Sequence, residues 1–400
     1  MNNKPPQPPA APAHPITTLA ALAAALGMSA ALAQAPTASG RLQLELIGQY
    51  QTNLFDESAA EINAYDPQTR QLFVINSQSR MIDVLDISDP TNPQLVRSLD
   101  VSGSIAGGGD LNSLAVQNGI VALAVANDNE TDTGWAVFLA ADNLDLPLAT
   151  ARVGALPDMI TFTPDGRHAL VANEGEPNDS YAVDPQGSIA VIDLGSGSIA
   201  DVGKVGDDAV RIAGFEAFSA DQLREKGVRI FGANNPSAAQ DLEPEYIAVS
   251  ADSSTAYVAL QENNALAIVD IAAAAVTDVV ALGFKDHSQP GNELDASNKD
   301  GQINIRNWPV LGMYQPDALA TYAVAGKTYM VTANEGDARD YDGFSEETRI
   351  KDLNLDAQSF PTAGQLQKDA NLGRLKTTTT LGDSDGDGDF DQIYSYGARS

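Results

Sequence analysis

The segment Leu72-Phe-Val-Ile, a turn of five residues and the segment Met81-Ile-Asp-Val-Leu-Asp86 form the pattern that decides the fold. The same pattern recurs, with a turn of the same length, as Ala256-Tyr-Val-Ala and Ala265-Leu-Ala-Ile-Val-Asp270. Short apolar segments that are separated by polar turns are typical of β-strands. Their repetition along one chain indicates an architecture built from repeats.

A third copy of this strand pair, Ala169-Leu-Val-Ala and Ser188-Ile-Ala-Val-Ile-Asp193, has a longer loop. A further short strand precedes each copy, and its first position is occupied by an acid or by Asn. These positions are Glu61, Asn112, Asp158, Glu245, Asp317 and Asp391. Strands that recur about every 45–50 residues predict an all-β fold, a β-propeller of four-stranded blades, with five blades and part of a sixth in this chain.

Two insertions lengthen the repeat, at residues 205–243 and 284–315, and the first contains a predicted short helix from Ser219 to Lys226. Residues 42–47 alternate as a strand that has no blade of its own, and the sixth blade is only begun at Ser400. We therefore expect a propeller domain over residues 42–400 that is truncated at its C-terminus. The parent protein would continue to about seven blades, the last of them completed by the N-terminal strand.

Residues 1–33 have the pattern of a signal peptide. Lys4 precedes an apolar run from Ile16 to Ala33 that ends in Ala-Leu-Ala. An uncleaved membrane anchor is the alternative, but no basic flank follows the run. The sequence therefore predicts an exported protein, secreted, periplasmic or at the cell surface, with no membrane-spanning segment in the mature chain.

Composition excludes several classes of protein. The chain has 54 Asp and Glu against 23 Lys and Arg, and its formal net charge of −31 opposes nucleic-acid binding. With no Cys it can form no disulfide, thiolate zinc site or iron–sulfur cluster. Motifs for a nucleophile elbow, a phosphate-binding loop or a histidine-rich zinc site are absent, so the sequence assigns no catalytic residue.

The positions that begin the blades are the first candidate site. In a propeller the innermost strand lines the central channel, so Glu61, Asn112, Asp158, Glu245 and Asp317 would lie near one mouth of it. These residues form either a ring of oxygen ligands for a hard cation or caps that satisfy neighbouring backbone groups.

Two enlarged acidic loops are the second candidate. Each follows the second strand of its blade, and each packs three acids closer together than a hairpin turn requires: Glu174, Glu176 and Asp179 in one loop, Glu335, Asp337 and Asp340 in the other. Such acids repel one another unless they are solvated or neutralised, which favours binding of a metal ion or a cationic ligand. Arg339 could instead neutralise its own loop or bind an anion such as phosphate.

The third candidate has alternating Asp residues, as calcium-binding loops do. Its residues are Asp383, Asp385, Asp387, Asp389 and Asp391. They occupy positions 1, 3, 5, 7 and 9 of such a loop, with Gly388 at the sharp turn, whereas position 12 is Tyr394 instead of Glu. We expect calcium here, with magnesium less favoured, and a solvated acidic loop is the alternative.

Four longer segments resemble the choice-of-anchor I family. They are Leu242-Glu-Pro-Glu-Tyr-Ile-Ala-Val-Ser, Leu260-Gln-Glu-Asn-Asn-Ala-Leu-Ala, Gly312-Met-Tyr-Gln-Pro-Asp-Ala and Thr332-Ala-Asn-Glu-Gly-Asp-Ala-Arg-Asp-Tyr-Asp-Gly-Phe. The resemblance spans residues 44–400 and implies a bacterial secreted or surface propeller that continues past Ser400. Members of the family are often labelled alkaline phosphatase-like, but the family supplies no agreed catalytic residues.

These observations lead to two functional hypotheses. The first is an exported, calcium-stabilised β-propeller that acts as a binding module at the cell surface or outside the cell. The alternative is a phosphoesterase of the alkaline phosphatase or phytase-like kind that depends on calcium or magnesium. In that case the loops of Glu174 and Glu335 would hold the ions.

Overall fold

The computed structural model describes residues 44–55 and 59–399. The signal peptide predicted at 1–33 and residues 42 and 43 of the predicted N-terminal strand lie outside the described residues. The chain divides into two units, Met1–Leu46 and Ile47–Ser400. The predicted strand at 42–47 is not formed in its described part, because residues 44–47 belong to no sheet.

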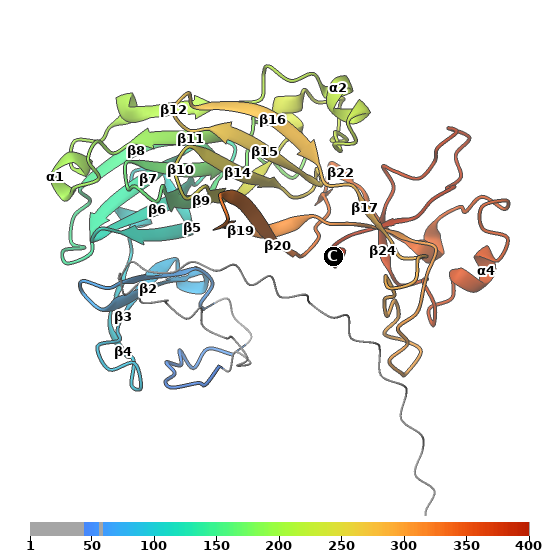
Figure 1. The fold of residues 1–400 in the computed structure, drawn as a ribbon, viewed down its shortest axis with the longest axis horizontal. Coiled ribbons are helices and arrows are strands. Elements are labelled where there is room, and N and C mark those ends of the chain that lie inside the picture. Colours follow the sequence, from blue (N-terminus) through green and yellow to red (C-terminus); the bar gives the residue numbers. More distant parts are fainter. Residues whose placement is uncertain (1–43, 56–58, 400) are drawn as a thin grey trace, which may run out of the picture. The chain divides into compact units, whose positions relative to one another are not determined.

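Four antiparallel sheets of four strands each follow one another along the second unit (Figure 1). The first contains β1 (Asn63–Asp66), β2 (Gln71–Asn76), β3 (Met81–Asp86) and β4 (Gln94–Leu99). The second contains β5 (Gly108–Gln117), β6 (Ile120–Asn127), β7 (Thr133–Ala140) and β8 (Ala149–Ala155). The third contains β9 (Pro157–Phe162), β10 (His168–Asn173), β11 (Ser188–Asp193) and β12 (Val210–Ala213). The fourth contains β13 (Pro244–Val249), β14 (Thr255–Leu260), β15 (Ala265–Asp270) and β16 (Ala275–Ala281).

The middle strands of the second, third and fourth sheets are apolar on both faces because each of these sheets packs between two others. On β6, Val121 and Leu123 belong to the core against the first sheet, whereas Ala122 and Ala124 belong to the core against the third. The third and fourth sheets share a further core, and the fourth sheet packs on Leu319 through its other face. Alternate side chains of a strand point to opposite faces, so continuous apolar runs are what stacked blades require.

The first strand of each sheet contacts the first strand of the next. β1 contacts β5, β5 contacts β9, β9 contacts β13, and β13 contacts β19 (Pro316–Val324). Face-to-face packing of successive four-stranded sheets, with their first strands innermost, is the arrangement of propeller blades. The all-β class and the β-propeller predicted from the repeats are thus confirmed.

The fifth blade differs from the expectation. β19 pairs with β20 (Lys327–Asn334) in a sheet of two strands. The segment predicted to open a sixth blade at Asp391 contributes β25 (Tyr394–Ser395), which pairs in parallel with β18 (Leu311–Met313). The reason is a separate small core, in which Trp308 and Val310 of the second insertion pack with Ile350, Phe360 and Ile393.

The remaining elements are short and belong to the insertions and the C-terminal region. The strands are β17 (Phe284–Asp286), β21 (Asp340–Tyr341), β22 (Phe344–Ser345), β23 (Glu347–Arg349) and β24 (Lys376–Thr378). The helices are η1 (Ser77–Ser79), η2 (Ser102–Ser104), α1 (Ile199–Val202), η3 (Asp207–Ala209), α2 (Ala220–Glu225), α3 (Ala238–Asp241), η4 (Ile350–Asp352) and α4 (Ala363–Leu366).

Helix α2 confirms the helix predicted at Ser219–Lys226, with Ser219 at the N-cap position. The insertion at 205–243 also supplies β12, the fourth strand of its blade. No helix among the described residues is long and apolar enough to cross a membrane.

Candidate functional site

The first strands of the five sheets surround one recess of about 440 Å³. It is lined by residues of β1, β5, β9, β13 and β19 and by Glu61, which precedes β1. Among the residues predicted for the channel mouth, Glu61, Asn112, Asp158 and Asp317 line this recess, whereas Glu245 is buried outside it. We call it the channel recess.

An irregularity in the sheets positions these acids. β9 and β19 begin with a proline, Pro157 and Pro316, that pairs with the last residue of the second strand, and Asp158 and Asp317 are the extra residues of the bulges that follow. The register shifts in the same way after Pro244, just before Glu245. A proline cannot donate to the ladder, and a bulge re-aims a side chain. This Pro-acid pair is a sequence signal that marks the irregular start of the first strand in three blades.

The residues predicted to form a ring at the channel mouth do not all have the same role. The Asn112 side chain donates to the backbone oxygen of Pro157 over 3.1 Å, so Asn112 satisfies a backbone group of the next blade. Glu61 accepts from the hydroxyl of Ser77 over 2.7 Å. Asp158, in contrast, faces other carboxylates.

A cluster of carboxylates lies where the third and fourth blades meet. Asp158 and Glu245 come from the bulges, Glu174 and Glu176 follow β10, and Glu262 lies in the turn between β14 and β15. Glu243, just before β13, completes the group. We call these six residues the inner carboxylate cluster. The sequence pointed to four of them, and missed Glu243 and Glu262.

Burial and mutual repulsion govern the charge of this cluster. Burial, and then the charge of Asp317, raise the pKa of Asp158 to about 7. Burial also raises the pKa of Glu174 and Glu245 well above the usual range, with neighbouring carboxylates adding to the effect. Burial raises the pKa of Glu262 as well, and the charge of Glu262 adds to the rise at Glu245.

One fixed positive charge, on Arg339, lies against the cluster. Its guanidinium is buried, with Nη1 2.7 Å from Asp241 Oδ1 and Nη2 2.8 Å from Glu243 Oε2. It stacks over Phe231 at 4.5 Å from the ring centroid. From the same loop, the Tyr341 hydroxyl donates to Glu176 over 2.8 Å. Arg339 therefore neutralises a segment distant in sequence instead of its own loop, and it is not free to bind an anion.

The acids of the two enlarged loops lie in different environments. Glu174 and Glu176 enter the cluster, but Asp179 is exposed at a turn. Glu335, Asp337 and Asp340 are exposed, and no three acids of these two loops have mutually close oxygens in the described residues. The second loop contacts the cluster through Arg339 and Tyr341, and not through the three acids that were predicted as ligands.

The loop at residues 383–391, the Asp loop, brings its carboxylates together at the surface. Asp383 accepts from the backbone N–H groups of Gly386, over 2.8 Å, and Gly388, over 3.1 Å. Both glycines have positive φ, which an L side chain rarely adopts, as the predicted sharp turn requires. Oxygens of Asp383, Asp385 and Asp391 lie within 4.8 Å of one another.

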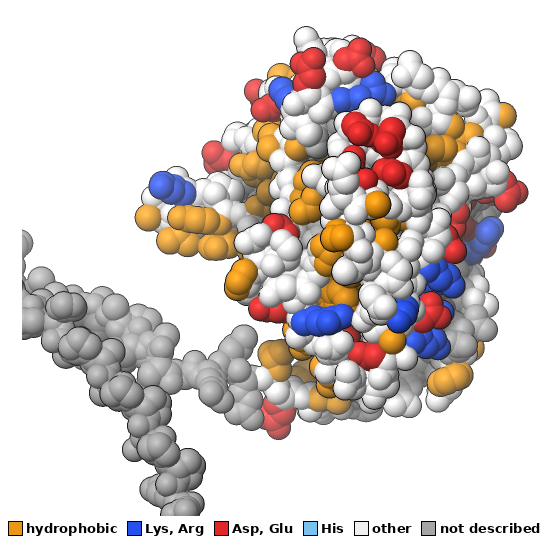
Figure 2. All heavy atoms as spheres, turned by 90° about the vertical axis from the view of Figure 1, so that its right-hand side faces the viewer, with side chains coloured by type: hydrophobic (Ala, Val, Ile, Leu, Met, Phe, Trp, Pro, Cys, Tyr) orange, Lys and Arg blue, Asp and Glu red, His pale blue; other side chains and the backbone are white. Residues whose placement is uncertain are grey.

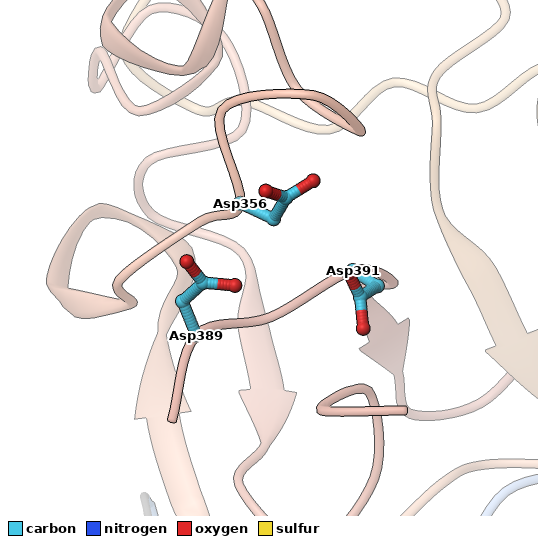
Figure 3. Close-up of side chains that lie close together, drawn as sticks. All are labelled: Asp356, Asp389 and Asp391. Atoms are coloured by element: carbon cyan, nitrogen blue, oxygen red, sulfur yellow. The ribbon is translucent and has the colours of Figure 1, made fainter. Parts of the chain in front are cut away.

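A second group at this loop contains a residue that the sequence did not indicate. Asp356, Asp389 and Asp391 also offer oxygens within 4.8 Å of one another, and Figure 3 shows them extending from two separate segments. A parallel bridge between Leu355 and Phe390 holds the segments together. Because that pairing is long-range, loop spacing alone could not reveal Asp356. Asp391 belongs to both groups, whereas Asp387, one of the predicted ligands, belongs to neither.

A recess of about 830 Å³ lies outside the channel. Three basic residues line it, Arg349, Arg374 and Lys376, together with the acids Asp337 and Glu347. On the face in Figure 2, Lys and Arg side chains likewise lie beside Asp and Glu side chains. The strongly negative chain therefore has local surfaces of mixed charge.

The fold and the acids at its channel define an acidic β-propeller. The chain belongs to the choice-of-anchor I family, because the family model for the choice-of-anchor I domain matches residues 61–400. The family predicted from the sequence is thus confirmed. No curated protein matches the chain.

Similar solved structures have low identity. A chain of a nidogen/laminin complex is 14% identical, with a TM-score of 0.35, and the match covers 56% of this chain and 65% of that one. A functionally unknown protein from Desulfotomaculum acetoxidans is 10% identical, with a TM-score of 0.42, covering 73% and 68%. Kuenenia stuttgartiensis hydrazine synthase is 11% identical, with a TM-score of 0.33, covering 68% and 83%. Nothing about function follows from these similarities.

Proposed function

We propose that this protein is an exported, calcium-stabilised β-propeller that acts as a binding module at the cell surface or outside the cell. The observation that carries the proposal is the channel recess, to which five successive blades contribute their first strands. A concave site with convergent polar groups is where a propeller binds its ligand. Because acids such as Glu61, Asp158 and Asp317 line this recess, its ligand carries positive charge or binds through a cation.

The Asp loop supports the role of calcium. Ca²⁺ takes six to eight oxygen ligands at about 2.3–2.6 Å, so the ligands of one ion lie within roughly 5 Å of one another. The spacing of the carboxylates of Asp356, Asp389 and Asp391 agrees with this. An ion here would join the segment at Asp356 to the segment before β25, and would thereby stabilise the small C-terminal core.

Thermal unfolding with calcium or with a chelator tests this role. Calcium at about 100 times its Kd contributes about 2.7 kcal/mol, so we expect Tm to rise by roughly 4 °C. The rise should be smaller in the double variant Asp383→Asn/Asp389→Asn and unchanged in the exposed control Asp132→Asn. If calcium leaves the Tm of the unmodified protein unchanged, the calcium part of the proposal is wrong.

Hydrolysis of phosphate esters is a second function that one observation favours. Arg349, Arg374 and Lys376 converge on the recess of about 830 Å³ beside Asp337, and such a combination can hold a phosphate group next to a metal-binding acid. Against it, Arg374 Nε already donates to Asn298 over 3.1 Å, and Lys376 pairs with Glu347.

An aryl phosphate assay distinguishes the two functions. Turnover that requires calcium and is lost in the variant Asp337→Asn, which removes an acid of this recess, would establish the enzyme. A protein that calcium stabilises, but that never cleaves the ester with or without chelator, would support the binding module.

A further inference from the structure

We propose that the inner carboxylate cluster is a second calcium site, in which Glu174, Glu245 and Glu262 bind one ion between the third and fourth blades. This inference rests on the proposed use of calcium by the propeller, but it concerns different residues from those of the Asp loop.

Equivalent elements of two adjacent blades supply these ligands. Glu174 directly follows β10, and Glu262 lies two residues after the end of β14, so both follow the second strand of a blade. Glu245 lies at the start of a first strand, beside the register shift after Pro244. β10 and β13 are in contact, so the strand that precedes Glu174 packs against the blade that carries Glu245 and Glu262. The ion would therefore cross-link two blades whose backbone positions are fixed by sheet pairing.

Two buried carboxylate oxygens in this cluster have no hydrogen-bond donor. Glu262 is 7% exposed, and its Oε2 accepts from no N–H or hydroxyl group of the described residues. Glu243 is 1% exposed, and Oε1 lacks a donor although Oε2 is paired with Arg339. A buried acceptor without a partner costs roughly 1–3 kcal/mol, and more when it is charged. A cation bound by Glu262 would satisfy its unpaired oxygen.

The protein's own positive charges do not balance the cluster. Arg339 is occupied by Asp241 and Glu243, and it also donates to the backbone oxygen of Asp241 over 2.7 Å. Arg229 donates to the backbone oxygen of Glu262, but its charge is paired with Glu346. One divalent ion would supply the missing countercharge.

The chemistry of the donors selects a hard cation. The six side chains offer carboxylate oxygen alone, which suits Ca²⁺ better than metals that prefer nitrogen or sulfur. No three of these carboxylates have oxygens within 4.8 Å of one another in the described residues, so binding requires rotations about their side-chain bonds. Ca²⁺ tolerates the irregular geometry that results, whereas Mg²⁺ demands a near-ideal octahedron.

Calorimetric titration of the full chain with Ca²⁺ tests the site. We expect the unmodified protein to bind calcium at both sites, Glu262→Gln to lose the equivalent bound by the cluster, and Asp383→Asn/Asp389→Asn to lose binding at the loop. Glu245→Gln should behave like Glu262→Gln. The matched control is Glu225→Gln, an exposed position on α2, which should bind as the unmodified protein does.

Stability separates a lost ligand from a damaged fold. In chelator, Glu262→Gln should have a Tm equal to or above that of the unmodified protein, because a buried repulsion is removed, and its gain in Tm with calcium should be smaller. If both Gln variants retain full stoichiometry and affinity while the loop variant loses binding, this inference is wrong and the proposed function stands. If the unmodified protein binds no calcium, both are wrong.

Discussion

The Asp loop and the inner carboxylate cluster are both rich in acids, but they are built in opposite ways. The loop takes most of its ligands from nine consecutive residues, and its backbone N–H groups already hold Asp383 at the surface. The cluster takes its acids from separate segments of two blades and buries three of them, Glu243, Glu245 and Glu262. Local spacing therefore reveals the first site, whereas only the topology of the sheets assembles the second.

The two sites also differ in what their charge costs the folded protein. Exposed carboxylates in the loop are solvated, so without an ion they remain tolerable. Buried carboxylates lose their hydration and must be protonated, paired or bound to a cation. The structure places Arg339 against the cluster and gives the loop no comparable partner in the described residues. Experiments that remove charge should therefore act far more strongly at the cluster.

Removal of Arg339 should have the largest effect. Arg339→Met leaves Asp241 and Glu243 buried without their countercharge, which should cost about 3–5 kcal/mol of the free energy of unfolding. Urea denaturation in calcium buffer measures this cost. The control Arg97→Met breaks a pair with the exposed Asp145 and should cost less than about 1 kcal/mol. Equal costs for the two variants would remove the contrast between buried and exposed charge.

Neutralising Asp158 should have an intermediate effect that depends on pH. In the metal-free protein its pKa is raised to about 7, so this carboxyl favours folding when protonated, and its contribution is lost as pH rises from about 4 through 7. In chelator, Asp158→Asn should therefore gain stability relative to the unmodified protein between pH 5 and pH 8. Because one pKa unit is about 1.4 kcal/mol, a gain on the order of 1–3 kcal/mol is expected.

The same comparison at the loop provides the control for that prediction. Asp383→Asn removes an exposed carboxylate, so in chelator its effect on Tm should change little between pH 5 and pH 8. A pH-dependent gain for Asp383→Asn as large as that for Asp158→Asn would contradict the distinction between the two sites.

Much of the fold could be predicted because each blade repeats a local pattern of short apolar strands and polar turns. The strand pair at 72–86 and its copy at 256–270 gave the correct sheets, and the blade starts at Asp158 and Asp317 lie in β9 and β19. The C-terminal region could not be predicted in this way. Its short strands depend on contacts between the second insertion and residues 347–393, and such contacts between distant segments leave no period in the sequence.

The candidate sites show the same division. The alternating Asp residues indicated the loop, since its ligands are neighbours in sequence. Asp356 was not indicated, because a long-range bridge between Leu355 and Phe390 places it beside Asp389 and Asp391. At the cluster, the Pro-acid pairs at the bulges were visible in the sequence, whereas Glu262 sits in an ordinary polar turn. Nothing in that turn predicts burial, because burial arises from the neighbouring blade.

Asp356 provides the smallest expected effect and the sharpest test of the loop. Asp356→Asn removes one charged oxygen from the group with Asp389 and Asp391, which should weaken calcium binding at the loop about tenfold, or about 1.4 kcal/mol. Its carboxylate also accepts backbone N–H groups of Gln358 and Ser359, and the Asn side-chain oxygen can still accept them, so Tm in chelator should hardly change. Calorimetry on the background of Glu262→Gln isolates the loop, with Asp387→Asn as the matched control from the same segment. If Asp387→Asn weakens binding and Asp356→Asn does not, the ion is held by the consecutive Asp pattern alone, and the contribution of the distant segment is refuted.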